Sequence, residues 1–193
     1  NDDPHQAFSP YNNFYYIPGQ SLHTGLDTER RSEIPYDETP AKVTGNDHFD
    51  AWPSRNDWYE TVKLNYGVDY LGGRQTHFTP VPSTWLKMTD ILLFWAKKGV
   101  DAFRCDMAEM VPAEFWAYAT KKVKEKYPEV LFIAEVYNPA EYRHYIASGF
   151  DYLYDKVGLY DTLRGIVAGG WSASCITGCW QAIDDIRPHM LNF

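Results

Sequence analysis

An arginine and two acids form the most chemically suggestive pattern in this chain of 193 residues. Arg104 and Asp106 stand two positions apart in the predicted strand 100–106, and Glu135 stands in the predicted strand 130–136. Because alternate side chains of a strand share one face, Arg104 lies beside Asp106. A fixed cation favours the ionised form of a neighbouring carboxyl group, so Asp106 is the candidate nucleophile.

The two acids suit chemistry on a glycosidic bond. Parallel strands joined by one helix usually lie side by side, about 5 Å apart. Asp106 and Glu135 should therefore meet at the carboxyl ends of the strands, where ligands bind in this fold class. Two carboxyl groups about 5 Å apart are typical of a retaining glycosidase. Glu135 is the better proton donor, because an apolar strand and a nearby acid both disfavour its charged form.

Structural interpretations of the same residues stay open. Arg104 and Asp106 could form an ion pair that only stabilises the fold, and Glu135 could cap a neighbouring helix. Glu109 lies beyond the strand, which favours a loop or first-turn acid over a catalyst. Several aromatic residues could stack on sugar rings or simply pack in a core, namely Trp52, Trp58, Tyr59, Tyr66 and Tyr137.

The elements that position these residues begin near Pro82. From there helical stretches alternate with short apolar strands, which predicts βα units around a parallel sheet. Residues 1–80 are rich in Asn, Asp, Gly, Pro and Tyr and lack a sustained period, so they predict an irregular region with a few short strands. The predicted helices cover about 83–98, 112–127, 138–149 and a last region to about 189, broken near Gly169–Gly170, and the other strands cover 150–154 and 190–193.

Composition and charge exclude several kinds of partner. The net charge is −8 and 45% of the residues are hydrophobic, so the chain can bury a core but offers no basic stripe for nucleic acid. The lysine-rich run 121–126 predicts a solvated helix face. No apolar stretch is long enough to predict a membrane segment. Cys105, Cys175 and Cys179 are expected to be free thiols, without the second ligand pair that a zinc site needs.

Two stretches resemble signature segments of the α-amylase family, glycoside hydrolase family thirteen. They are 99–106, Gly-Val-Asp-Ala-Phe-Arg-Cys-Asp, and 131–136, Leu-Phe-Ile-Ala-Glu-Val. The resemblance implies that Arg104 holds the nucleophile, that Asp106 is the nucleophile, and that Glu135 is the general acid and base. It also implies an α-glucan substrate, such as starch or a maltooligosaccharide.

Three further residues are candidates for substrate binding. Tyr137 follows the predicted acid and could stack on a sugar. Glu109 and Met110 stand where α-amylases often carry a Lys-His pair after the nucleophile. This departure means that strict α-amylase specificity is not expected.

The resemblance implies an α/β fold, a partial (β/α)8 TIM barrel with about strands 4 to 7 in residues 81–193. Residues 1–80 would be the lobe that the family inserts after strand 3, since 58–66 resembles a signature of that lobe. The family's third essential acid and its Asn-His segment are both missing. We therefore expect an incomplete excerpt of an enzyme, inactive alone. Self-association is expected too, because an open sheet exposes edges and apolar helix faces.

The sequence predicts a retaining α-glucan hydrolase, with two alternatives. A glucan transferase would use the same carboxylates with an acceptor sugar in place of water, and a non-catalytic relative would bind partners only. No cofactor is required; calcium binding stays open, because Lys63 stands where the lobe signature often has a calcium-linked aspartate and hard cations need several oxygen ligands. A polysaccharide-degrading parent favours a secreted or periplasmic location, which the sequence does not fix.

Overall fold

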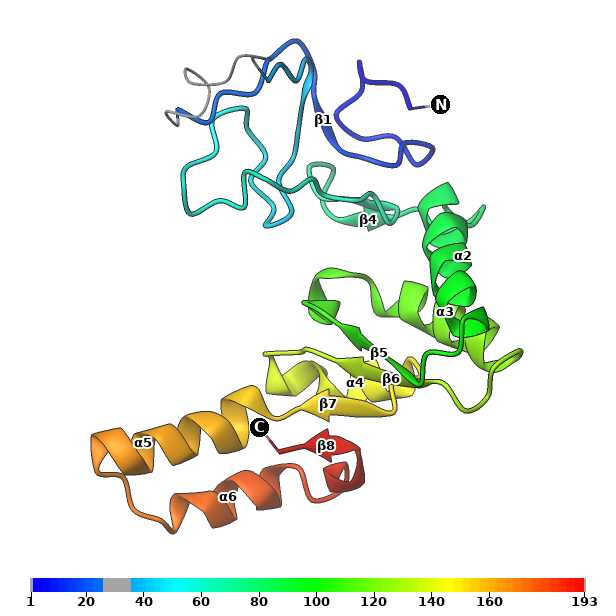
Figure 1. Ribbon diagram of the computed structural model, residues 1–193. Helices are drawn as coiled ribbons and strands as arrows, with labels where there is room; N and C mark the ends of the chain where they lie inside the picture. Colours follow the sequence, from blue (N-terminus) through cyan, green and yellow to red (C-terminus); the bar gives the residue numbers. More distant parts are fainter. Residues whose placement is uncertain (1, 26–35, 193) are drawn as a thin grey trace. The chain divides into compact units, whose positions relative to one another are not determined.

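A computed structural model describes residues 2–25 and 36–192 (Figure 1). The chain divides into two compact units, a first unit Asn1–Lys87 and a second unit Met88–Phe193. The first unit is largely irregular, as its composition predicts. It contains two separate antiparallel pairs of two-residue strands, β1 (Tyr16–Ile17) with β2 (Ala41–Lys42) and β3 (Val68–Asp69) with β4 (Gln75–Thr76).

Aromatic side chains form the core of the first unit. Tyr15 is 2% exposed, and the rings of Phe49 and Tyr70 meet it edge-on at centroid distances of 5.8 and 5.7 Å. Lys63 is buried beside this core, where its ammonium group pairs with Asp47 and lies 4.6 Å from the centre of the Tyr70 ring. A buried cation is thus neutralised by one acid and one aromatic face.

A four-stranded parallel sheet, in the order β5-β6-β7-β8, organises the second unit (Figure 1). The sequence prediction of four strands in this region is confirmed, and each strand is shorter than predicted. The sheet has free edges at β5 and β8, and the described residues close no barrel. The strands are β5 (Ala102–Cys105), β6 (Leu131–Ala134), β7 (Tyr152–Tyr154) and β8 (Met190–Leu191).

Helices connect these strands at the predicted places. Gly99, with φ of +89°, follows the first helix, and Gly170, with φ of +68°, ends a later one, because glycine adopts left-handed backbone without a Cβ clash. Pro112 precedes α3 instead of lying in its first turn. The helices are α2 (Ser83–Lys97), α3 (Ala113–Lys124), α4 (Tyr142–Ala147), α5 (Asp161–Gly169) and α6 (Cys175–Ala182), with short 3-10 turns η1 (Ala108–Met110), η2 (Pro139–Glu141) and η4 (Arg187–His189) and the π-helical turn η3 (Lys156–Tyr160).

One face of the sheet is covered by α3 and carries the core. Phe132 of β6 is 0% exposed, and its ring lies 6.3 Å from that of Phe150, which in turn lies 5.0 Å from Trp116 of α3. Trp116 Nε1 also donates to the Ala108 carbonyl at 3.0 Å. Packing of α3 on the sheet therefore fixes the turn that follows β5.

The apolar side chains of α2 are only partly covered. Leu86, Ile91, Phe94 and Trp95 are 47 to 54% exposed, so the helix supplies less core than its sequence pattern predicts. The prediction of self-association depends on such exposed apolar helix faces. Self-association itself stays a prediction. Among the described residues, no helix combines the length and the apolar character needed to cross a membrane.

Candidate active site

Strand pairing brings the two predicted acids together. β5 and β6 pair in register, Arg104 opposite Ile133 and Cys105 opposite Ala134. The pairing continues one residue further, because the Glu135 N–H donates to the Cys105 carbonyl at 3.0 Å. Asp106 and Glu135 are consequently neighbours at the carboxyl ends of adjacent strands, as the sequence predicts.

Arg104 bridges both carboxylates. One guanidinium nitrogen hydrogen-bonds to Asp106, and the other, Nη2, lies 2.9 Å from Glu135 Oε1. The side chain of Asp106 is 72% exposed and that of Glu135 is 14% exposed. Arg104 and Asp106 are therefore open to solvent, whereas the side chain of Glu135 is largely covered.

The charges around Asp106 favour its ionised form. The hydrogen bond from Arg104 lowers the pKa of Asp106, partial burial opposes this, and a hydrogen bond with the Glu135 carboxyl group lowers the pKa again. The same contact raises the pKa of Arg104, so the guanidinium stays charged. At neutral pH the cluster therefore presents an anionic, solvent-exposed oxygen beside a second carboxyl group.

Three donors orient the carboxyl group of Glu135. Besides Arg104, the Tyr137 hydroxyl donates to Oε1 at 2.7 Å and the Met107 N–H donates to Oε2 at 3.0 Å. The bond to Glu135 raises the pKa of Tyr137, so its hydroxyl remains a donor. The Tyr137 ring is 37% exposed and stands directly beside the two carboxyl groups.

Met107 is a feature that the sequence reasoning missed. Its φ of +46° is left-handed, a backbone conformation that costs a non-glycine residue roughly 1–3 kcal/mol and that clusters at functional sites. This conformation aims the Met107 N–H at Glu135. No sequence signal could have revealed it, because methionine is not among the residues enriched in left-handed backbone.

The other predicted site residues lie in the turn after β5. Glu109 Oε2 accepts the Asn138 N–H at 3.1 Å, which ties this turn to the segment after β6. Glu109 is thus a first-turn acid of η1, and Met110 ends the same turn half-buried. Glu135 accepts the N–H of Met107, the residue that precedes η1, so its side chain supports a three-residue 3-10 turn as well as contacting Arg104.

The aromatic candidates separate into exposed and buried residues. Trp52 is 64% exposed and stacks on His23 at a centroid distance of 4.2 Å, while Trp58 is 39% exposed and Tyr59 is half-buried. Tyr66 is 9% exposed, so of the two alternatives left open for it the structure favours packing over a sugar platform.

The described residues contain no cluster of three or more His, Cys, Asp or Glu side chains suited to a metal ion. Calcium binding stays a prediction. Cys105, Cys175 and Cys179 are free thiols, as expected. Burial raises the pKa of Cys105 to about 12, which keeps this neighbour of Arg104 protonated and unreactive.

Comparison with curated proteins gives short matches. No protein-family model matches the chain. The chain is 38% identical over 55 residues to an alpha-1,4-glucan:maltose-1-phosphate maltosyltransferase of Myxococcus xanthus (strain DK1622), covering 28% of this chain and 8% of that protein. A maltosyltransferase of the same description from Burkholderia pseudomallei (strain K96243) is 31% identical over 75 residues, covering 38% and 7%. The matches thus span less than a tenth of these two relatives.

Comparison with solved structures covers more of the chain. An alpha-amylase from Lactobacillus plantarum superposes with a TM-score of 0.52 and 28% identity over 68% of this chain and 30% of that one. A cyclic alpha-maltosyl-(1-->6)-maltose hydrolase from Arthrobacter globiformis superposes with a TM-score of 0.56 and 20% identity over 74% and 30%. The second likeness supports the α/β fold with a parallel sheet.

Proposed function

The likeness to the α-amylase family is thereby confirmed, and from it we propose that this chain carries the nucleophile and the acid–base residue of a retaining enzyme that acts on α-glucans. The observation that carries the proposal is the single arginine that contacts both Asp106 and Glu135. We assign β5 to β8 to strands 4 to 7 of a (β/α)8 barrel.

Each residue has a defined role in the proposed reaction. The Asp106 carboxylate attacks the anomeric carbon while the bond to the leaving oxygen breaks, and Glu135 gives that oxygen its proton. Glu135 then takes a proton from the incoming acceptor as the acceptor oxygen displaces Asp106. Arg104 keeps Asp106 ionised before the attack, and the Tyr137 hydroxyl holds the Glu135 carboxyl group in place.

The different exposure of the two acids supports this division of roles. Asp106 is 72% exposed, so its oxygen can reach a sugar carbon that approaches from solvent, whereas Glu135 is 14% exposed. The Glu135 carboxyl group is fixed in position by Arg104, the Tyr137 hydroxyl and the Met107 N–H, as a general acid and base requires. A purely structural ion pair needs no such difference in exposure.

A transferase is the second candidate, and the curated relatives favour it. The matched curated proteins are described as maltosyltransferases, whereas the Lactobacillus plantarum structure is described as an alpha-amylase. Both reactions share the first step at Asp106. They differ in the acceptor that Glu135 deprotonates, which is water in hydrolysis and a second hydroxyl compound or phosphate in transfer.

The experiment that tests the proposal replaces each acid in the protein that carries this chain with the rest of the barrel. Asp106→Ala and Glu135→Gln should each lower turnover of a maltooligosaccharide by at least about three orders of magnitude, given what a nucleophile and an acid–base group contribute. Asp101→Asn, at an exposed acid just before β5, is the control and should stay within about twofold, as expected for surface substitutions. Surviving activity in either acid variant would remove the mechanism.

A second measurement separates the roles of the two acids. Maltosyl fluoride needs little protonation of its leaving group, so Glu135→Gln should still form the covalent intermediate but hydrolyse it slowly. Intact-mass spectrometry should then show a maltosyl adduct on Asp106 in Glu135→Gln and none in Asp106→Ala. Product analysis in water alone, with added phosphate and with an added glucan acceptor distinguishes hydrolase from transferase. We further propose that residues 1–193 alone have little activity, because the family's third acid is missing.

A further inference from the structure

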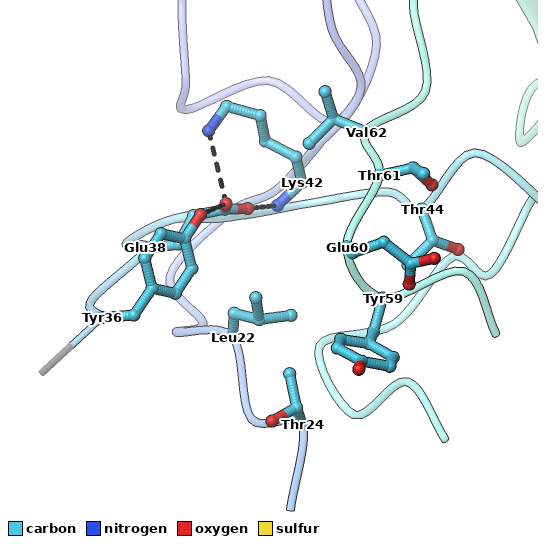
Figure 2. A pocket seen from close by; sticks show the side chains of 10 residues that line it. All are labelled: Leu22, Thr24, Tyr36, Glu38, Lys42, Thr44, Tyr59, Glu60, Thr61 and Val62. Atoms are coloured by element: carbon cyan, nitrogen blue, oxygen red, sulfur yellow. Dashed lines mark hydrogen bonds and ion pairs between the residues drawn. The ribbon is translucent and has the colours of Figure 1, made fainter. Parts of the chain in front are cut away.

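A pocket of about 360 Å³ lies in the first unit, which contains none of the proposed catalytic residues (Figure 2). Figure 2 shows the rings of Tyr36 and Tyr59 on opposite sides of this pocket, with Leu22 between them. Pockets for small ligands usually measure about 300–1,000 Å³ and combine apolar walls with a few polar groups. The volume therefore suits one small molecule that lies between two phenol rings.

A hydrogen bond to a buried acid holds the first ring in place. The side chain of Glu38 is 9% exposed, and its Oε2 accepts the Tyr36 hydroxyl at 2.5 Å. This bond raises the pKa of Tyr36 to about 12, so the phenol keeps its proton at neutral pH. Tyr36 is 70% exposed, so the ring is fixed at its hydroxyl end while its face is open to a ligand. A ring that is already fixed loses less conformational entropy when a ligand binds.

The cationic side chain among the described lining residues, Lys42, faces away from the pocket. Its Nζ lies 5.9 Å from the ring centres of Phe14 and Tyr16, neither of which lines the pocket. Figure 2 shows this ammonium group on the side of Glu38 away from Tyr59, and it lies 3.8 Å from Glu38 Oε2. Lys42 therefore offsets the charge of Glu38 from outside the pocket and offers no cationic group to a ligand inside it.

Glu60 supplies the charge that the pocket presents. It is exposed, it follows Tyr59 in the chain, and Figure 2 shows it on the Tyr59 side of the pocket. Among the residues that the structure describes, no cationic side chain forms an ion pair with Glu60. The pocket thus combines two aromatic faces with one negative charge that no described cation offsets.

Two ring faces beside one carboxylate favour an organic cation. A cation within about 6 Å of the centre of an aromatic ring is attracted by the negative face of the ring, and quaternary ammonium groups are typically recognised in this way. An anion would meet Glu60 as a like charge. The methyl groups of an alkylated ammonium compound can also pack on the apolar side chain of Leu22, which a hydrated inorganic cation cannot do.

We propose that this pocket binds a small organic monocation, an alkylated ammonium compound, between the rings of Tyr36 and Tyr59, with Glu60 as the counter-charge. This ligand belongs to a different chemical class from the proposed glucan substrate. The site gives the first unit a binding function of its own, and it shares no residue with the reaction proposed at Asp106 and Glu135.

The test compares choline with 3,3-dimethylbutan-1-ol, which has the same shape but a neutral carbon in place of the charged nitrogen. Each compound gives one strong methyl signal, so saturation-transfer NMR can follow the binding of both to the full chain of 193 residues. Choline should bind at least about tenfold more tightly, because only choline is attracted by two ring faces and a carboxylate. Equal binding of the two compounds would overturn the proposal, since the pocket would then select apolar shape alone.

Two variants at Tyr59 distinguish the ring from its hydroxyl group. Tyr59→Phe keeps the ring face and should bind choline within about twofold of the parent, whereas Tyr59→Ala should weaken binding about threefold, the loss of one partly exposed contact between cation and ring. Equal losses in the two variants would show that the hydroxyl binds the ligand, which contradicts the proposal. Tyr11→Ala is the matched control and should stay within about twofold, because Tyr11 is 72% exposed in the same unit and does not line this pocket.

Glu60→Gln tests the counter-charge. It should weaken choline binding about threefold, as expected for the loss of an exposed ion pair, and leave the binding of 3,3-dimethylbutan-1-ol within about twofold. Glu129→Gln is the control, because it makes the same change of charge at an exposed acid of the second unit. If both variants weaken choline binding equally, choline responds only to the net charge of the chain and the proposed site is wrong. Circular dichroism spectra of all variants should match that of the parent.

Competition with maltotriose supplies the remaining outcome. Maltotriose should leave the choline signal unchanged, because a neutral sugar carries no charge for Glu60 to attract. Displacement of choline by maltotriose would make this pocket a carbohydrate site and would overturn the proposal. That result would leave the proposed reaction intact, because turnover by Asp106→Ala and Glu135→Gln tests the reaction separately.

Discussion

The two compact units of the chain are stabilised in different ways. In the first unit the strands are only two residues long, and bonds between distant residues hold the chain, such as the Tyr15 hydroxyl that donates to the Val68 carbonyl 53 positions away. In the second unit, short βα repeats build a parallel sheet over an apolar core. The second unit is therefore locally encoded, and the first depends on contacts that no short stretch of sequence encodes.

The largest expected loss of stability comes from a substitution in the apolar core of the second unit. Phe132→Ala should lower the free energy of unfolding by about 3–5 kcal/mol, because a large buried side chain is replaced by a cavity. Phe94→Ala, at a phenylalanine of α2 that is 54% exposed, is the matched control and should cost less than about 1 kcal/mol. Amide hydrogen exchange reports each unit separately. Equal loss of protection in both variants would show that α2 is covered in solution.

Alanine substitutions at two glycines distinguish the stability cost of backbone strain from the added cost of a steric clash. Gly99 and Gly149 both have left-handed φ, +89° and +102°, but a Cβ at Gly99 meets nothing within 4 Å and a Cβ at Gly149 overlaps Thr120 Oγ1. Gly99→Ala should cost about 1–2 kcal/mol from the backbone conformation alone. Gly149→Ala should cost about 3 kcal/mol, because overpacking adds to the backbone strain. Thermal unfolding of the two variants measures the difference, and equal shifts would mean that Thr120 moves freely.

The second unit shows how far its sequence predicts a structure. Gly99 and Asn138 mark the end and the start of helices that the structure contains. Alternation along β5 and β6 correctly places Arg104 and Asp106 on one face, next to Glu135. Each of these predictions rests on residues within one strand–helix–strand repeat, where local patterns determine the geometry.

What the sequence did not predict depends on contacts across longer distances. The left-handed Met107 follows from the fit of its turn onto Glu135, and methionine carries no signal for that conformation. The pocket of the first unit joins Leu22, Tyr36 and Tyr59, which no period or motif connects. Tyr59 alone had a chemical signal, as one aromatic residue among several candidates.

The buried ion pair of Lys63 with Asp47 is a polar contact of the first unit whose contribution to stability can be measured. Asp47→Asn should cost about 1–2 kcal/mol, because it leaves the Lys63 ammonium group buried without its acid, although exposure of Asp47 reduces the loss. Lys63→Met removes the buried charge and keeps a side chain of similar length, so it should cost less than Asp47→Asn. Hydrogen exchange of first-unit amides measures both. A larger loss for Lys63→Met would show that the ion pair is net stabilising.

The smallest expected effect on stability belongs to the contact that matters most for the proposed chemistry. Arg104→Met removes the donor that lowers the pKa of Asp106, so Asp106 should titrate at higher pH in the variant. A carboxyl group with a lowered folded-state pKa stabilises the fold above its unfolded-state pKa, and this contribution is lost as pH falls through the folded-state value. Because Asp106 is 72% exposed, the contribution should stay below about 1 kcal/mol.

Carbon-13 NMR titration of the Asp106 carboxyl group measures this change directly, and Arg143→Met is a matched control because Arg143 pairs with the exposed Asp185 on the same unit. Only Arg104→Met should move the titration of Asp106, and neither substitution should change thermal unfolding by much. An unmoved Asp106 titration would mean that Arg104 does not set its charge. If the titration of Asp106 shifts and the stability does not change, the ion pair of Arg104 with Asp106 sets the charge of Asp106 and contributes little to folding. The stability of the second unit then comes mainly from its apolar core.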